Sequence, residues 1–188
     1  DDWRARPNIT LSLGLRFETQ GYIHDRGDWA PRLGFAWGVG GRNGQPKAIV
    51  RGGFGIFYDR FQSEQILQAE RVNGIVQKQY VLVNPTCFPV AANCDLSTAS
   101  AATPTVYAVS PRLHAPYTLQ SAISVERQVT KSATLSVTYL NSRGFDQLGT
   151  INANAPLPGN NFRPDPSQGN VYEFVSESVF RQQQLILN

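Results

Sequence analysis

The sequence predicts an all-β fold: an antiparallel up-and-down sheet of a transmembrane β-barrel. Three observations predict it. Apolar and polar residues alternate along several stretches, short and long connectors alternate between those stretches, and no stretch is apolar enough for a membrane helix. A strand with one apolar face has this period of two, because successive side chains point to opposite faces.

The strictest alternation lies in residues 8–18, NITLSLGLRFE, after a start (1–8) that reads as the end of one strand and a turn. Leu11, Leu13 and Leu15 fall on one parity, and Ser12 and Arg16 on the other. The pattern recurs in five later stretches, the last with weak alternation: 29–39, 48–61, 116–127, 133–142 and 170–188. Each of these stretches is predicted to be a strand.

The connectors alternate in length. The short ones, rich in turn-forming residues, are 6–8, 40–47 and 127–132, and the long ones are 19–28, 60–115 and 145–170. All short turns therefore lie at one end of the sheet. Outer-membrane barrels have short periplasmic turns and longer extracellular loops, so 60–115 is predicted to be a long extracellular loop, with a short helix in 63–74 and an extended return in 103–111.

Aromatic residues lie near the ends of the predicted strands, where the interfacial girdles of a membrane barrel are expected. They are Trp3, Phe17, Trp29, Tyr58, Tyr117 and Tyr139. The apolar parity of each strand is then interpreted as facing lipid, and the polar parity as facing a wet interior.

The two cysteines, Cys87 and Cys94, lie in the predicted long loop. They lack CxxC spacing and a nearby histidine, so they do not indicate a metal site. They are a candidate disulfide in an oxidising compartment, and two free thiols are the alternative.

Other chemistry is not supported by the sequence. The formal charge of +3 is scattered, which argues against a nucleic-acid partner. The glycines of 38–47 miss phosphate-loop spacing, and they are better explained by a turn that needs positive φ. His24 and His114 have no spacing relation to a nucleophile. We expect no enzyme activity, catalytic residue, metal or cofactor, and no ligand-binding residue can be named.

Seven phrases in this order resemble the β-barrel region of TonB-dependent outer-membrane receptors, in particular the Oar-like group with a carboxypeptidase-regulatory-like domain. They are NITLSLGLRFE, WAPRLGFAWGVGG, IVRGGFGIFYDRF, PYTLQSAISVERQ, SVTYLNSRG, INANAPLPG and VFRQQQLILN. The resemblance implies that residues 1–188 are a fragment, a partial arc of a large barrel in the bacterial outer membrane, without the plug domain. A chain that starts at DDWRARPN and lacks Met agrees with a fragment.

The resemblance also implies partners: outer-membrane lipid, the plug domain of the same parent chain, a TonB-type energy-coupling protein and an unknown solute. Charged residues on the polar parity are candidate lumen- or plug-facing residues, expected to pair with one another or hold the plug before they contact solute. They are Arg16, Arg32, Arg51, Asp59 and Glu126.

The leading hypothesis is therefore wall and loops of a transporter for energy-coupled solute passage. Two alternatives stay open: an outer-membrane adhesion or structural barrel, and a soluble carbohydrate-binding β-sandwich.

Overall fold

The computed structural model describes residues 1–23, 25–41, 45–77, 87, 105–159 and 161–188. They belong to two compact units. The first, named the wall unit, comprises 1–60, 114–147 and 176–188, and the second, named the loop unit, comprises 61–113 and 148–175.

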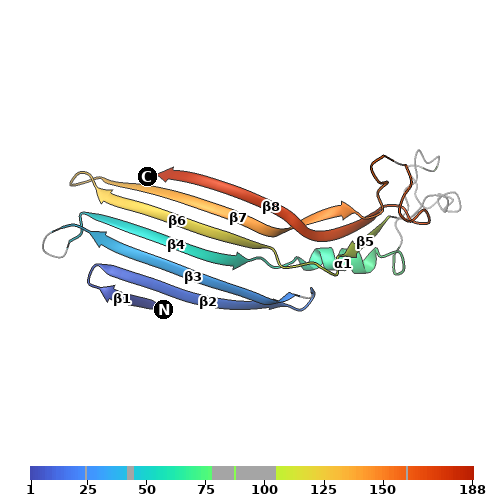
Figure 1. Ribbon diagram of the computed structural model, residues 1–188, viewed down its shortest axis with the longest axis horizontal. Helices are drawn as coiled ribbons and strands as arrows, with labels where there is room; N and C mark the ends of the chain where they lie inside the picture. The colour runs from blue at the N-terminus through green and yellow to red at the C-terminus, as the bar shows by residue number, and fades with distance from the viewer. Residues whose placement is uncertain (24, 42–44, 78–86, 88–104, 160) are drawn as a thin grey trace. The chain divides into compact units, whose positions relative to one another are not determined.

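The strands form one sheet (Figure 1). They are β1 (Asp2–Arg6), β2 (Ile9–Gln20), β3 (Asp25–Val39), β4 (Ala48–Tyr58), β5 (Val106–Val109), β6 (Tyr117–Gln128), β7 (Thr134–Asn152) and β8 (Val171–Leu187), in the spatial order β1-β2-β3-β4-β6-β7-β8-β5. Neighbours from β1 to β7 pair antiparallel, and Ser136 and Asn188 exchange two backbone hydrogen bonds that join β7 to β8. The predicted antiparallel up-and-down sheet is confirmed, with one difference: β5 runs parallel to β8.

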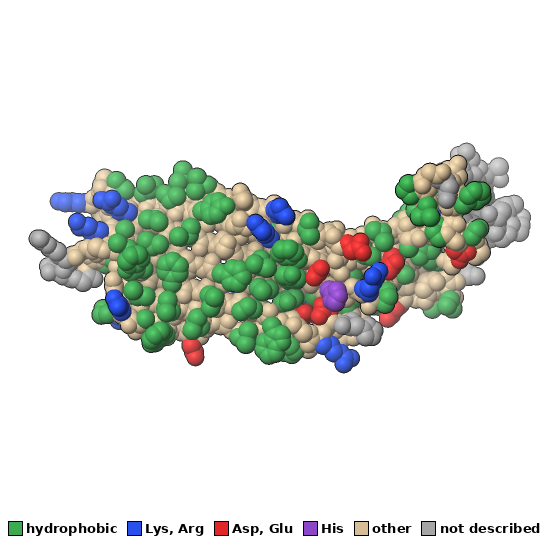
Figure 2. All heavy atoms as spheres, viewed as in Figure 1, with side chains coloured by type: hydrophobic (Ala, Val, Ile, Leu, Met, Phe, Trp, Pro, Cys, Tyr) green, Lys and Arg blue, Asp and Glu red, His purple; other side chains and the backbone are tan. Residues whose placement is uncertain are grey.

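The register of the wall unit sorts apolar and polar residues onto opposite faces. Leu13 lies opposite Leu33, which lies opposite Phe54, whereas Ser12 lies opposite Gly34 and then Gly53. Directly opposite residues share a face, so the alternation of single strands becomes an apolar face across the sheet. Figure 2 shows this field of hydrophobic side chains. Leu13 and Leu33 are each 53% exposed, so this face is not a packed core.

Aromatic side chains form a row at one end of the apolar field. Phe17 and Trp29 are opposite each other with ring centroids 4.7 Å apart, and Tyr117 stacks between Tyr58 and Phe145 at 5.3 Å from each. Tyr139 is an exception to the expected placement near strand ends. It lies opposite Ile123 within the field, because β7 continues to Asn152 rather than ending near residue 142.

The short connectors are confirmed, but the long ones differ from the prediction. Only residues 21–24 separate β2 from β3, so the predicted loop 19–28 is wrong, and the loop predicted at 145–170 shrinks to 153–170. A register shift between Glu18 and Gln20 and several charged residues conceal the alternation at the ends of β2 and β3. Residues 60–115 do separate β4 from β6.

The loop unit contains the predicted helix and extended return. α1 spans Ser63–Arg71, and β5 pairs with the start of β8. Tyr107 stacks on Phe174 at 6.2 Å between ring centroids, and Phe61 contacts Phe174 edge-on. This aromatic cluster is the small core on which the helix and β5 are built, since Phe61 and Phe174 are buried.

Asn154 organises the rest of the loop unit. Its side chain is buried, donates to the carbonyl oxygens of Asp165, Gln168 and Gly169, and accepts from the Asp165 amide, all within 3.0 Å. Arg163 Nη1 donates to the Asn154 carbonyl at 2.8 Å. The Asn154 side chain in the phrase INANAPLPG thus fixes the conformation of this loop through hydrogen bonds.

Cys94 lies outside the described residues, so its pairing with Cys87 stays a prediction. No helix in the described ranges has the length and hydropathy needed to cross a membrane.

Candidate lumen-facing site

Two ion pairs lie on the polar face of the wall unit. Arg51 Nη1 lies 2.6 Å from Glu126 Oε2, and Arg16 Nε lies 2.8 Å from Glu18 Oε1. Alternation places Arg51 and Glu126 on one face, and the β4–β6 register brings them within reach. Two of the five predicted site residues therefore meet each other, and Arg16 pairs with a residue that the prediction did not name.

Arg32 makes a different contact. Its guanidinium carbon lies 4.6 Å from the centroid of the Phe57 ring, a cation–π geometry. Its Nε is buried and has no hydrogen-bond partner among the described residues. Gly55 lies opposite Arg32, and a Cβ there would come within 3.0 Å of the Phe57 ring. The Phe57 and Arg32 side chains therefore fill the space above Gly55.

Asp59 does not lie in a strand. β4 ends at Tyr58, and the Asp59 amide donates to the Pro116 carbonyl at 2.8 Å. The predicted strand 48–61 ends earlier, at Tyr58, and the assignment of Asp59 as a lumen- or plug-facing residue stays a prediction.

An acidic cluster at the β2–β3 end escaped the sequence analysis. Asp28 is 2% exposed and lies opposite Glu18, and its carboxyl oxygen Oδ2 is buried without a hydrogen-bond partner among the described residues. Asp25 Oδ2 accepts from the Ala115 amide at 2.7 Å and lies 3.6 Å from His114 Nδ1. Glu18 and Asp28 both fall on the polar parity of their strands, so the alternation could have placed them on one face. Residues 19–28 were predicted to be a loop, however, and the pairing of these two residues was therefore not recognised.

The contacts of Asp25 with Ala115 and His114 tie the 114–116 segment to β3. No group of three or more His, Cys, Asp or Glu side chains in the described part of the chain has the arrangement of a metal site.

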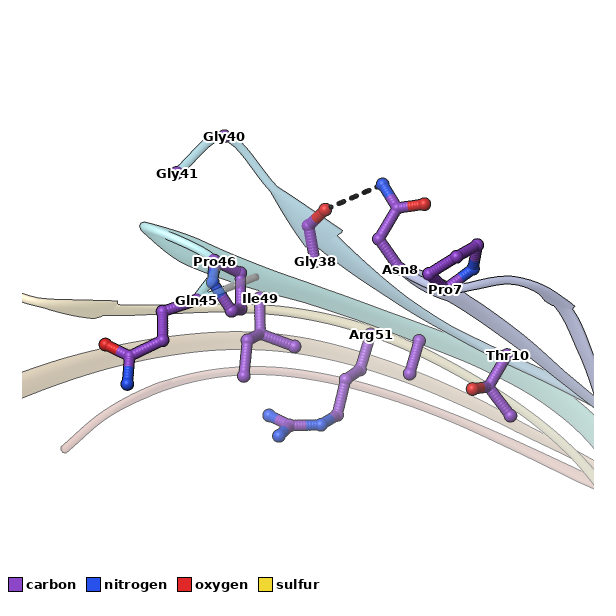
Figure 3. Close-up of a pocket in the computed structure, with 11 residues that line it drawn as sticks. Pro7, Asn8, Thr10, Gly38, Gly40, Gly41, Gln45, Pro46, Ile49 and Arg51 are labelled. Atoms are coloured by element: carbon purple, nitrogen blue, oxygen red, sulfur yellow. Dashed lines mark hydrogen bonds between the residues drawn. The ribbon is translucent and has the colours of Figure 1, made fainter. Parts of the chain in front are cut away.

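A hollow of about 550 Å³ lies at the short-turn end of the wall unit (Figure 3). Its residues come from β2, β3, β4 and the adjoining turns: Pro7, Asn8, Thr10, Ala36, Gly38, Gly40, Gly41, Gln45, Pro46, Ile49 and Arg51. Asn8 Nδ2 donates to the Gly38 carbonyl at 3.1 Å, as drawn in Figure 3. The hollow offers backbone polar groups and one guanidinium, that of Arg51.

Gly40 and Gly41 take positive φ, +64° and +113°. A Cβ on Gly41 would collide with the Gln45 carbonyl oxygen. These glycines are explained by the turn, in agreement with the sequence analysis.

The sequence of residues 19–184 matches the family model described as "Outer membrane beta barrel domain". The chain belongs to this outer-membrane β-barrel family. The barrel domain is therefore a protein of the bacterial outer membrane, and the soluble β-sandwich is ruled out. No curated protein is similar enough in sequence to count as a match.

Solved structures share the fold of the barrel domain. The outer membrane transporter YddB from Escherichia coli is similar with a TM-score of 0.68 at 13% identity, over 96% of this chain and 19% of the transporter. The siderophore receptor PirA from Pseudomonas aeruginosa gives 0.58 at 14% identity, over 98% and 28%. A mutant of the ferric enterobactin receptor PfeA from P. aeruginosa gives 0.61 at 12%, over 98% and 22%. The barrel domain thus spans between 19% and 28% of the length of each.

Proposed function

We propose that the barrel domain forms part of the wall and the extracellular loops of a TonB-dependent, Oar-like transporter, and serves energy-coupled passage of a solute. The observation that carries the proposal is the division of the sheet into an exposed apolar face and a polar face with paired charges. A wall between lipid and an aqueous or protein-filled interior needs these two faces.

The two edges of the sheet support the interpretation that the barrel domain is a segment of a larger barrel rather than a closed barrel. β1 stands at one end, and on the other side β8 continues past its short pairing with β5. In hydrocarbon an unpaired strand edge leaves backbone groups without partners. Further strands of a parent chain would satisfy both edges, which agrees with the small share of each receptor that the domain spans.

The polar face suits a filled interior. Arg51 is paired with Glu126, so its charge is already compensated within the wall, and Arg32 lies over the Phe57 ring. On this proposal the plug domain of the parent chain packs against the polar face and the hollow at the short-turn end. The loop unit then lies outside the cell, where its surface first meets the solute.

The test uses the full-length protein that contains this chain, purified from outer membranes in detergent. The periplasmic domain of the host's TonB-type protein, carrying a fluorescent label, is titrated against it. Saturable binding that is lost when a peptide copying the receptor's own TonB-binding segment is added supports energy-coupled transport. A full-length protein that lacks any such interaction is instead an adhesion or structural barrel.

A further inference from the structure

Two arginines face each other across β7 and β8. Ser136 and Asn188 are directly opposite, since they exchange two backbone hydrogen bonds. Gly144 abuts the ring of Phe180, which would collide with a Cβ at that position. Both strands advance eight residues between these pairs, from 136 to 144 and from 188 to 180, so the register places Arg143 opposite Arg181.

The type of strand pair that they form brings side chains close together. Hydrogen-bonded and non-hydrogen-bonded pairs alternate along an antiparallel ladder, and the Arg143–Arg181 pair is seven residues from a hydrogen-bonded one. It is therefore a non-hydrogen-bonded pair, the type in which Cα atoms are about 4.5 Å apart and side chains are closest.

The pair lies on the apolar face. Arg143 is directly opposite Leu119 of β6, and Leu119 is opposite Ile56 of β4. Both arginines are exposed, and Figure 2 shows basic side chains beside the hydrophobic field of this face. Phe145, in the aromatic row, lies two residues from Arg143 on the same face.

Nothing in the described residues neutralises this pair. The nearby acids along the two strands, Asp146 and Glu177, form no ion pair with either arginine, and the ion pairs of the described chain lie elsewhere. Like charges directly opposite each other destabilise a strand pair. Two guanidinium groups on a membrane-facing surface therefore require an anion from outside the chain.

We propose that Arg143 and Arg181 form a binding site for a phosphate group of an outer-leaflet lipid. The proposal rests on the proposed function, which directs the apolar face to lipid and the loop unit outward. Aromatic girdles mark the level of the headgroups, and arginine side chains reach from the edge of the apolar field toward that level. Two planar guanidinium forks match the oxygen atoms of one phosphate group.

A lipid is favoured over a free anion because of where the site lies. Leu119 and Phe145 flank the pair, so a ligand that also covers apolar surface fits better than a small ion. Acyl chains and a phosphate joined in one molecule supply both contacts.

The test compares full-length proteins in detergent. Wild type, the double variant Arg143→Gln/Arg181→Gln and the control Arg127→Gln are titrated with bisphosphorylated lipid A and with lipid A from which both phosphates have been removed. Arg127 is a matched control, since it lies on the same face at the short-turn end, opposite Ala48 and Leu135. Bound lipid is counted by native mass spectrometry.

We expect the double variant to bind bisphosphorylated lipid A at least about tenfold more weakly than wild type, and Arg127→Gln to bind like wild type. Removal of the phosphates should weaken wild-type binding to the level of the double variant. Equal binding by wild type and the double variant overturns the proposal. Displacement of the lipid by inorganic phosphate at equal concentration also overturns it, because the site then takes a soluble anion.

The folded state of each variant is checked by its heat-modifiable migration on a gel, so a loss of binding is not confused with unfolding. If the Arg variants bind normally while a charge placed on the apolar face elsewhere still prevents folding, the lipid-facing assignment stands and only the phosphate site fails.

Discussion

Arg51 of β4 and Glu126 of β6 are joined by an ion pair of 2.6 Å across two neighbouring strands, diagonal to the directly opposite pairs Arg51–Ser124 and Ile49–Glu126. Residues 75 positions apart in the chain thus meet on the polar face. Their side chains are 48% and 38% exposed, so water screens much of the attraction.

A double-mutant cycle with Arg51→Gln and Glu126→Gln is therefore expected to give a coupling free energy of about 0.2–1 kcal/mol. The measurement is urea unfolding of the full-length protein in lipid vesicles. The same cycle at Arg16 and Glu18 is the matched comparison, because that pair lies on the same face within one strand. A coupling of several kcal/mol would mean that the interior excludes water far more than the exposed side chains indicate.

Substitution of Leu13 with Arg tests the assignment of the faces. Leu13 lies in the apolar field opposite Leu33, whereas its neighbour Ser12 is on the other face, with its hydroxyl 2.6 Å from Asp2 Oδ1. Leu13→Arg is expected to lower the free energy of unfolding in vesicles by about 2–4 kcal/mol, the cost of a charge near the bilayer midplane. Ser12→Arg should cost much less, and equal costs would refute the assignment.

Adjacent glycines of β4 should respond differently to a methyl group. A Cβ on Gly52 would enter the Phe35 ring, which covers this glycine, whereas a Cβ on Gly53 would meet only the Leu33 carbonyl oxygen at 3.4 Å. Gly52→Ala is expected to destabilise by about 1–3 kcal/mol through overpacking, and Gly53→Ala by less. The unfolding midpoint in urea reports both, and Phe35→Ala should remove most of the penalty at Gly52.

Individual strands show how much of the fold could be predicted from the sequence. Period-two alternation identifies β2, β4 and β6 because each has one apolar and one polar face. It fails where the strands leave the apolar field: the ends of β2 and β3, and the outer part of β7, carry polar residues on both faces, so nothing in their hydropathy separates them from a loop. The acidic residues Asp25 and Asp28 were missed for this reason, whereas β4 was predicted to run past its end at Tyr58.

The prediction of the lumen-facing residues from sequence has the same limit. The alternation placed Arg51 and Glu126 on one face. Their contact depends on the register between β4 and β6, which turns and packing set over many residues of the chain. Contacts such as Arg32 on Phe57 depend on side-chain direction, which a hydropathy pattern does not contain.

Loss of the Asn154 side chain should open the loop unit. Asn154→Ala removes the donor to the carbonyl oxygens of Asp165, Gln168 and Gly169 and the acceptor of the Asp165 amide. The Asp165 and Gly169 carbonyl oxygens keep a second donor, so the expected cost is about 1–3 kcal/mol in total. Hydrogen exchange in residues 163–171 is expected to accelerate by at least tenfold. Asn161→Ala, at an exposed position of the same loop, is the control and should leave the exchange unchanged.

Acid should loosen the same loop. The hydroxyl and amide of Ser167 donate to the Asp165 carboxylate, and these bonds lower the pKa of Asp165 below its usual value of 3.8. A group with a depressed pKa in the folded state stabilises it above the unfolded pKa, and this contribution is lost as the pH falls through the folded one. Exchange of the Ser167 amide should therefore accelerate below about pH 4. Asp165→Asn should show no such dependence on pH, and an acceleration in both proteins would assign the effect to other groups.

The order of the sheet has a consequence for assembly of the protein. From β1 to β4, and again from β6 to β8, each strand lies beside the next one in the chain, so these pairings close only small loops and lose little chain entropy. Two wide closures remain: β4 joins β6 across the segment that contains α1 and β5, and β5 joins β8. Topologies rich in local pairing fold fast, and two hairpin modules, β1–β4 and β6–β8, can form separately before the β4–β6 seam joins them. Lengthening the segment between them should slow that last step only weakly, because the entropy of closure grows with the logarithm of loop length.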